Sequence, residues 1–372
     1  MNRTTKLMAV GSALLALTVT ACGGESKAND DTSSAKADVA KAKEQAAKFR
    51  TIGMPDDWNN YGAFWDGVCK TNDLGCAGAA GKNREDASDA SSAETIQFFK
   101  DDKQNPAVCG DIGIAFTGPA DENKVALNYL PEKAKSLPAQ YRGKNGGWEA
   151  HVTGAIAILV NKDKVPNPPK SFADLKKPEY KGKIFMKNPE ESGTGQATVF
   201  AVAAALGQGK DGFDLDAALK YFKELQDAGQ FAKAKFSDEA FERGETPIAL
   251  GYDYVYLESA KTLKAKGVNA EVSIPTDGGV WAPSALICNA NTTAPDLAKL
   301  AMDYALTDEG QKLFAQIGAH PIRYVLGDLQ LSDADKANWL PESQYAAVKQ
   351  FPNDEWPSAA DLASRWKDEV QN

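Results

Sequence analysis

The chain is poor in the residues on which most metal sites and hydrolytic sites depend. Its 372 residues include two histidines, His151 and His320, and five cysteines. It has no His-Glu-x-x-His, Cys-x-x-Cys or Gly-x-Ser-x-Gly motif and no Walker loop. Gly193-Thr194-Gly195 lacks the third glycine of a dinucleotide fingerprint. We therefore expect no metal and no cofactor, and these absences disfavour an enzyme.

Positive charge is also in short supply. The chain has 42 Lys and Arg against 51 Asp and Glu, a formal net charge of −9, and no basic cluster. This balance argues against nucleic acid as a partner. With 43% hydrophobic and 25% charged residues, the composition is that of a globular protein. The length suggests two domains, or one fold in two lobes.

Long apolar runs are confined to the N-terminus. Arg3 and Lys6 precede an apolar stretch at 7–21 that is too short for a permanent membrane helix. A charged start, a short apolar run and small residues are typical of a secretion signal. Val19-Thr20-Ala21-Cys22 resembles a bacterial lipobox. We expect a signal peptide at 1–21, a lipid such as palmitate on Cys22, and a flexible tether at 22–36. The folded part is then extracytoplasmic and anchored to a membrane, on its periplasmic side or outer face.

The remaining four cysteines predict disulfides, because an even number in an exported protein favours pairing. Three pairings are open. Cys69 and Cys76 bracket a turn-rich loop and are the favoured pair, which leaves Cys109 for Cys288.

Helix and strand patterns alternate along the mature chain, which predicts α/β layers with a largely parallel sheet. The expected strands are 49–54, 111–116, 154–160, 183–186, 247–251, 272–274 and 284–288. The expected helices are 37–49, 92–103, 171–175, 195–206, 215–228, 295–305 and 309–317.

Polar groups gather where strands end and helices begin. Three such places are Asp56-Asp57-Trp58, Ser91-Ser92 and Ser192-Gly193-Thr194-Gly195-Gln196. Ligands of α/β sheets bind outside the carboxyl ends of strands, where helix N-termini offer N–H groups. Each segment alone is more typical of a cap or a turn. Their presence in both halves of the chain favours a cleft between lobes.

Four segments carry a resemblance to a known family. Residues 165–175 read Val-Pro-Asn-Pro-Pro-Lys-Ser-Phe-Ala-Asp-Leu, and residues 177–184 read Lys-Pro-Glu-Tyr-Lys-Gly-Lys-Ile. Later segments are Leu-Thr-Asp-Glu-Gly-Gln-Lys at 306–312 and Ala-His-Pro-Ile-Arg at 319–323. Together they resemble the extracellular solute-binding proteins of bacterial ABC importers. The chain is most similar to the branch of iron(III), thiamine, polyamine and phosphonate binders.

The resemblance implies a two-lobe, type II periplasmic-binding-protein-like fold with the ligand cleft between lobes joined by hinge strands. The first lobe is expected at 37–150, the second lobe at 151–280, and the returning part of the first lobe with the C-terminal helices at 281–372. The chain would cross near 149–152 and return near 278–281. It also implies a monomer that catalyses nothing and delivers a small-molecule solute to an ABC permease with its ATPase.

The ligand is less determined. Tyr252 and Tyr254 flank Asp253 where the iron(III) binders carry tyrosine ligands, and an extended segment would put both rings on one face. Equally, the tyrosines could be packing residues of a sheet. Asp253, Trp58 and the tyrosines could instead hold an amine, and the helix-start serines an acidic group. We favour a polyamine, aminophosphonate or amino-acid-like solute, with ferric iron as the alternative. A surface lipoprotein hydrolase using Ser192 with a lysine or His151 is the alternative of another class.

The expected ligand-binding residues come from both lobes and from the crossings. They are Asp57, Trp58, Ser91, Ser92, Thr117, Thr153, Ser192, Gly193, Thr194, Tyr252, Asp253, Tyr254 and Trp281.

Overall fold

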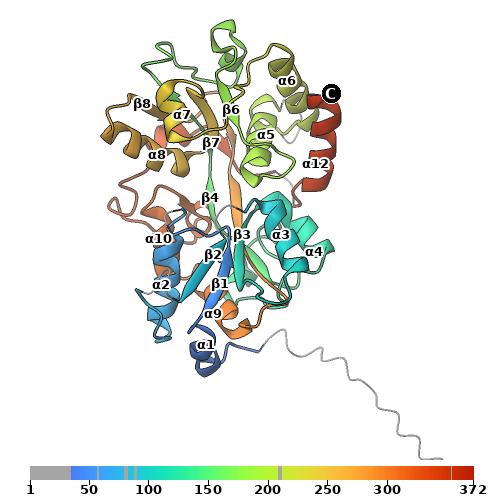
Figure 1. Ribbon diagram of the computed structural model, residues 1–372, viewed down its shortest axis with the longest axis vertical. Coiled ribbons are helices and arrows are strands. Elements are labelled where there is room, and N and C mark those ends of the chain that lie inside the picture. The colour runs from blue at the N-terminus through green and yellow to red at the C-terminus, as the bar shows by residue number, and fades with distance from the viewer. Residues whose placement is uncertain (1–34, 57, 79–82, 88–89, 208–211, 353) are drawn as a thin grey trace, which may run out of the picture.

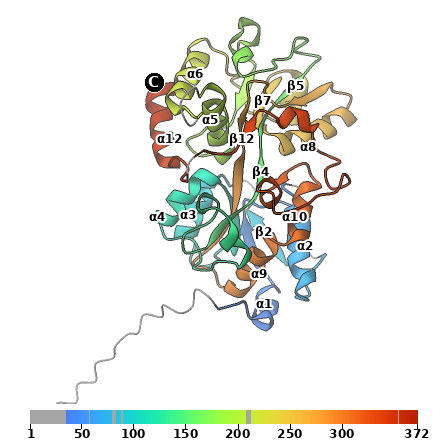
Figure 2. The same ribbon diagram turned by 180° about the vertical axis from the view of Figure 1, so that it is seen from behind.

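The computed structural model describes residues 35–372 except 57, 79–82, 88–89, 208–211 and 353. The expected signal peptide, Cys22, all but the last two residues of the tether, and Asp57 lie outside the described residues. Two lobes are stacked along the long axis of the molecule (Figures 1 and 2). No helix within the described ranges is both long and apolar enough to cross a membrane.

A six-stranded sheet forms the centre of the first lobe. Its order is β11-β4-β10-β3-β1-β2. The strands are β1 (Phe49–Ile52), β2 (Arg84–Ala87), β3 (Cys109–Gly113), β4 (Trp148–Gly154), β10 (Ala282–Cys288) and β11 (His320–Pro321). The helices of this lobe are α1 (Val39–Gln45), α2 (Tyr61–Thr71), α3 (Ser92–Asp101), α4 (Thr117–Glu122), α9 (Pro295–Ala305), α10 (Asp308–Ala315) and α11 (Ile322–Val325).

A four-stranded sheet of order β6-β7-β5-β8 forms the second lobe. Its strands are β5 (Ile156–Asn161), β6 (Ile184–Met186), β7 (Ile248–Tyr252) and β8 (Ala270–Ser273). The helices around it are α5 (Gly193–Leu206), α6 (Leu215–Asp227), α7 (Asp238–Arg243), α8 (Asp253–Ala265) and α12 (Ala359–Trp366). Strand β5 is buried at every position, as its unbroken apolar run requires. Helix α5 is apolar on all sides and is buried along most of its length.

The prediction of a largely parallel sheet is wrong. Pairs β1–β2, β1–β3 and β6–β7 are parallel, whereas β10 runs antiparallel to both β3 and β4, and β5 runs antiparallel to β7 and β8. The chain returns from the second lobe through β10, which enters the first sheet between β3 and β4 in the opposite direction. A chain that crosses and returns therefore produces a mixed sheet.

The chain passes between the lobes at two places. Strand β4 belongs to the first sheet as far as Gly154, and β5 begins the second-lobe segment at Ile156. The return runs between the end of β8 and the start of β10. Here the short strand β9 (Gly279–Val280) pairs in parallel with β12 (Val348–Lys349).

We expected the C-terminal helices of 281–372 to pack on the first lobe, but the last helix packs on the second lobe. Helix α12 lies beside α6 in both views (Figures 1 and 2). Trp366 packs on Phe222 with ring centroids 5.2 Å apart, and Arg365 pairs with Asp216 at 2.7 Å. An amphipathic helix needs an apolar surface, and the sequence alone does not say which lobe supplies it.

The structure contains both favoured disulfides. Cys69–Cys76 closes the turn that follows α2, and Cys109–Cys288 joins residues that face each other across β3 and β10. The second bridge links residues 179 positions apart in sequence, and so ties the returning strand to the first half of its sheet.

Candidate ligand-binding cleft

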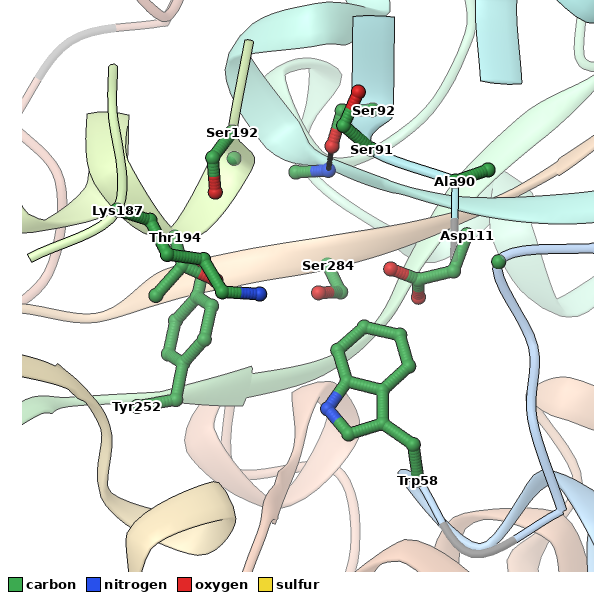
Figure 3. A pocket seen from close by; sticks show the side chains of 13 residues that line it. Trp58, Ala90, Ser91, Ser92, Asp111, Lys187, Ser192, Thr194, Tyr252 and Ser284 are labelled. Atoms are coloured by element: carbon green, nitrogen blue, oxygen red, sulfur yellow. Dashed lines mark hydrogen bonds between the residues drawn. The ribbon is translucent and has the colours of Figure 1, made fainter. Parts of the chain in front are cut away.

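A cavity of about 70 Å³ lies between the two lobes (Figure 3). The first lobe contributes the turn after β1, the start of α3, the end of β3 and one residue of β10. The second lobe contributes the residue after β6, the start of α5 and the end of β7. The lining residues are Gly53, Trp58, Ala90, Ser91, Ser92, Asp111, Gly113, Lys187, Ser192, Gly193, Thr194, Tyr252 and Ser284.

The lobes touch each other beside this cavity. A Cβ atom at Gly113 would lie 2.5 Å from Gly193 Cα, and a Cβ at Gly193 would lie 2.6 Å from Gly113 Cα. Close by, Ala93 N–H donates to Glu191 O across the lobes at 3.4 Å. The structure is therefore a closed form, and its closure depends on the absence of side chains at both glycines.

Helix α3 begins at the cavity with a capping box. Ser91 Oγ accepts the Glu94 N–H, and the Glu94 carboxylate accepts the Ser91 N–H at 2.7 Å. This backbone hydrogen bond is the main reason that the pKa of Glu94 is lowered. Ser92 Oγ accepts the Gly113 N–H at 3.0 Å, so both hydroxyls already serve their own lobe.

Helix α5 begins on the facing side. Ser192 Oγ accepts the Gly195 N–H at 3.3 Å. The N–H groups of Ser92, Gly193 and Thr194 donate to no acceptor within the described part of the chain. Two helix starts from opposite lobes therefore leave N–H groups available at one cavity.

Lys187 follows β6 and brings a positive charge to the same place. Its ammonium points into the cavity in Figure 3. No carboxylate among the described residues lies within 4.0 Å of it. Its side chain stays accessible, yet neighbouring protein atoms displace water from it, and this desolvation lowers the pKa of the ammonium. Lys187, Gly193 and Thr194 together form a site suited to an anion.

Asp111 stands on the first-lobe side. It is 6% exposed, and the Tyr61 hydroxyl donates a hydrogen bond to its carboxylate. That hydroxyl lies 2.9 Å from His151 Nε2. Burial raises the pKa of Asp111 to about 8 and lowers the pKa of His151 to about 3. His151 is thus neutral and does not balance a negative charge on Asp111.

The two tyrosines are arranged differently from the prediction. Tyr252 ends β7 and Asp253 begins α8, so the segment is not extended. The rings of Tyr252 and Tyr254 still stack, with centroids 5.2 Å apart, because the chain turns into the first helical turn. Tyr252 lines the cavity, whereas Tyr254 does not.

Asp253 lies at the hinge and not in the cavity, which corrects its predicted place. Its carboxylate accepts the Ala155 N–H at 3.2 Å and the Tyr345 hydroxyl at 2.8 Å. It is fully buried, and burial raises its pKa to about 7. Asp253 therefore holds the crossing strand and the C-terminal segment together.

Three further predicted residues also lie outside the cavity lining. Thr117 begins α4 and donates to Ile114 O at 2.7 Å. Thr153 is buried in β4 between β10 and β11. Trp281 stacks on Tyr345 at the hinge, with ring centroids 5.5 Å apart, and packs at a tilt against His320, with centroids 4.6 Å apart.

The sequence reading missed several lining residues: Gly53, Ala90, Asp111, Gly113, Lys187 and Ser284. Lys187 was detectable, because it directly follows the expected strand 183–186. Asp111 carried a weaker signal: it is an acid that begins the expected strand 111–116, directly before five apolar or small residues. Within the described ranges, no three His, Cys, Asp or Glu residues are grouped as a metal site.

Comparison with known proteins agrees with this architecture. The Escherichia coli K12 spermidine/putrescine-binding periplasmic protein is 25% identical over 219 residues, covering 58% of this chain and 59% of that protein. The periplasmic binding protein AfuA of Actinobacillus pleuropneumoniae, solved with fructose-6-phosphate, superposes with a TM-score of 0.65 at 18% identity, covering 87% of this chain and 98% of that one. Iron-bound HitA of Pseudomonas aeruginosa gives a TM-score of 0.61 at 18% identity, covering 87% and 99%.

The curated relatives are matched only in part, since the chain spans 57% to 65% of the length of those that it matches. The family model for bacterial extracellular solute-binding proteins matches residues 110–350, more than half of the chain. The fold is shared along most of the chain with periplasmic binding proteins. The chain belongs to the bacterial extracellular solute-binding protein family.

Proposed function

We propose that the protein is the solute-binding component of an ABC importer. It captures a small solute with an acidic group between its lobes and presents the closed form to a permease driven by an ATPase. The protein catalyses no reaction. Family membership supports this role, and one observation carries the choice of solute. Lys187 and the unused N–H groups at the starts of α3 and α5 meet at one interlobe cavity.

We infer that the solute has an acidic group from the positive electrostatic potential of the cavity at Lys187 and the two helix starts. A helix N-terminus carries roughly half a positive charge, and an anion placed there is stabilised. Ser92 lies on the first lobe, whereas Gly193 and Lys187 lie on the second. An anion that contacts both sides gains its full set of contacts only when the lobes are closed, so binding favours closure.

The charges at the cavity favour an acidic solute over a polyamine. Among the described lining residues, Asp111 is the single carboxylate. A polyamine carries at least two ammonium groups, and each needs its own acceptor. An aminophosphonate or amino-acid-like solute fits the cavity better.

A thermal-shift screen tests the choice of solute. The probes are 2-aminoethylphosphonate, β-alanine, spermidine, thiamine and ferric citrate. A ligand at 100 times its dissociation constant adds ~2.7 kcal/mol to the free energy of unfolding. We expect a higher melting temperature with a small acidic solute, and a much smaller shift in Lys187→Ala. Lys181→Ala removes an exposed lysine outside the cavity lining and is the control. A shift with spermidine alone, or with none of the probes, contradicts the proposal.

Ferric iron is the second candidate, favoured by the stacked pair Tyr252 and Tyr254 with Tyr252 at the cavity. In the metal-free protein, burial raises the pKa of both phenols, which opposes the phenolate form that binds iron. A shift with ferric citrate alone, lost in Tyr252→Phe, would select iron over the acidic solute.

Membrane anchoring is a separate part of the proposal, with the lipid on Cys22. Its support is the signal-like sequence at 1–21 and the lipobox-like segment that ends in Cys22. Cells expressing the protein and fed labelled palmitate should label the wild type but not Cys22→Ser. Equal labelling of the two proteins would contradict the anchor at this residue.

A further inference from the structure

The structure assigns to Asp111 and Trp58 the binding of a cationic group of the solute, an ammonium in the simplest case. This inference rests on the proposed function, because it adds a second charge to the same solute. Asp111 and Trp58 belong to the first lobe and lie on one side of the cavity, whereas Lys187, Ser192 and Thr194 belong to the second lobe and lie on the other (Figure 3). The solute class is therefore a small zwitterion.

Asp111 has no positive partner of its own. Within the described part of the chain, His151 is the one basic group within 4.0 Å, with Nε2 at 3.9 Å from the carboxylate. Because burial lowers the pKa of His151 to about 3, this ring is neutral at physiological pH. A buried carboxylate without a cation is costly, and a cation in the cavity removes that cost.

The surroundings fix the carboxylate in place. The Tyr61 hydroxyl donates to Asp111, so the nearby His151 Nε2–H is the donor to Tyr61. Ser284 lies beside the carboxylate on the neighbouring strand β10 (Figure 3). These groups orient Asp111 toward the cavity, and none of them carries a positive charge that would balance its ionised form.

Trp58 adds an aromatic surface at the same end. It is half-buried in the turn before α2, and its ring lies 5.9 Å from that of Tyr61. Figure 3 shows the indole ring at the cavity next to Asp111. An ammonium beside an indole face gains roughly 0.5–2 kcal/mol from the cation–π interaction.

Binding of an ammonium at Asp111 has a proton signature. Burial raises the pKa of Asp111 to about 8, so the empty cavity holds it largely protonated at pH 7. A bound ammonium favours the ionised form, so a proton is released. Lys187 lies across the cavity from Asp111 (Figure 3). The titratable groups packed around Asp111 are Tyr61 from α2, His151 from β4, Tyr252 from β7 and Tyr254 from α8. All four are neutral at pH 7, because burial raises the pKa of each phenol and lowers the pKa of the imidazole.

Paired probes isolate the amine. β-Alanine and propionate share a carboxylate, and 2-aminoethylphosphonate and ethylphosphonate share a phosphonate, so each pair differs in the ammonium. Calorimetry gives the affinities, and repeating the β-alanine and propionate titrations in buffers of different ionisation enthalpy counts released protons. Any change at Lys187 is common to both members of a pair and cancels in the comparison.

The wild type should bind the amine-bearing member of a pair at least about tenfold more tightly. Asp111→Asn should bring this ratio close to one and abolish proton release, while the affinity for the amine-free acid changes little. Asp303→Asn, a partly buried acid that accepts from Tyr129 outside the cavity, should behave as the wild type. Trp58→Leu should lower the ratio several-fold and provides a second variant if Asp111→Asn does not fold.

An unchanged ratio in both Asp111→Asn and Trp58→Leu would overturn the cationic subsite and leave the acidic site standing. If the wild type binds neither member of either pair, the proposed acidic site fails, and the cationic subsite is overturned with it.

Discussion

Asp111 and Asp253 are both buried in similar surroundings, but they have different roles in the molecule. Asp111 at the cavity and Asp253 at the hinge both contact a tyrosine hydroxyl and lie within 4 Å of a histidine, and burial raises the pKa of both. Asp253 also accepts the Ala155 N–H, so both of its oxygens have donors from the protein. Asp111 has its tyrosine on one side and the cavity on the other.

The comparison shows that burial and a raised pKa do not by themselves identify a binding residue. What separates the two is whether the protein fills the hydrogen-bonding capacity of the carboxylate. A filled carboxylate holds the fold together, whereas one that faces a cavity is available to a solute. Substitutions at both positions can break or sharpen this distinction.

The largest effect on stability is expected at the hinge. Asp253→Ala leaves the Ala155 N–H and the Tyr345 hydroxyl without their acceptor. We expect the free energy of unfolding to fall by about 3 kcal/mol. Asp111→Asn should lower it by less than about 1 kcal/mol, because the amide still accepts from Tyr61. Urea denaturation of both variants checks this, and equal losses would break the comparison.

The next largest effect is expected on solute affinity, from a substitution that prevents the lobes from closing fully. In Gly193→Ala the new Cβ meets Gly113 Cα at 2.6 Å, so the lobes cannot approach as closely. We expect at least about tenfold weaker binding of the acidic solute, because contacts that span the lobes are lost. Gly118→Ala is the control, since a Cβ there meets nothing within 4 Å. Small-angle scattering should show a larger radius of gyration for Gly193→Ala with solute. A wild-type radius and affinity would refute the role of this contact.

The two carboxyls also predict a pH dependence. The pKa values of Asp111 and Asp253, about 8 and about 7, lie above the ~3.9 of an unfolded aspartate. Above about pH 4 the folded state therefore binds more protons than the unfolded state. Its stability falls as pH rises until each carboxyl ionises in the folded state, near pH 7 for Asp253 and near pH 8 for Asp111. His151 and His320, whose pKa values are lowered to about 3, act in the opposite direction only below about pH 6.5. Asp111→Asn should flatten the decline in melting temperature between pH 7 and 8.5, whereas a wild-type slope would contradict the raised pKa.

The smallest effects are expected when Tyr345 or Tyr61, the tyrosines that donate to Asp253 and Asp111, is replaced by phenylalanine. Tyr345→Phe should cost about 1 kcal/mol of stability and leave affinity for the solute unchanged. Tyr61→Phe frees an oxygen of Asp111 and should change affinity for the amine-bearing solute several-fold. Calorimetry combined with urea denaturation distinguishes the two, and the opposite pattern would reverse the roles assigned to the two aspartates.

Local patterns predicted much of this molecule. Both disulfides follow from the number and spacing of the cysteines, and the helix starts at Ser91 and Ser192 follow from capping residues. The two lobes were inferred from the chain length and from the family resemblance. Trp58 was expected at the site from its position after the first strand, and Tyr252 from the family resemblance; both line the cavity.

The remainder depends on tertiary packing. Asp253 and Asp111 each sit in or beside an apolar strand, and the sequence does not show which of them the fold encloses completely. Gly113 and Gly193 are 80 positions apart in sequence, lie in different lobes and are not linked by strand pairing, so no local pattern predicts their contact. Helix α12 likewise packs on the second lobe because the surface around Phe222 offers it an apolar contact, which the sequence of the helix does not reveal.

The most direct measurement is a calorimetric titration of the wild type and Lys187→Ala with 2-aminoethylphosphonate, β-alanine and spermidine. If a small acidic solute is held between the lobes, the wild type binds at least one of the first two, Lys187→Ala binds it at least about tenfold more weakly, and spermidine does not compete. Equal affinity in both proteins, or binding of spermidine alone, would contradict an acidic solute at this cleft.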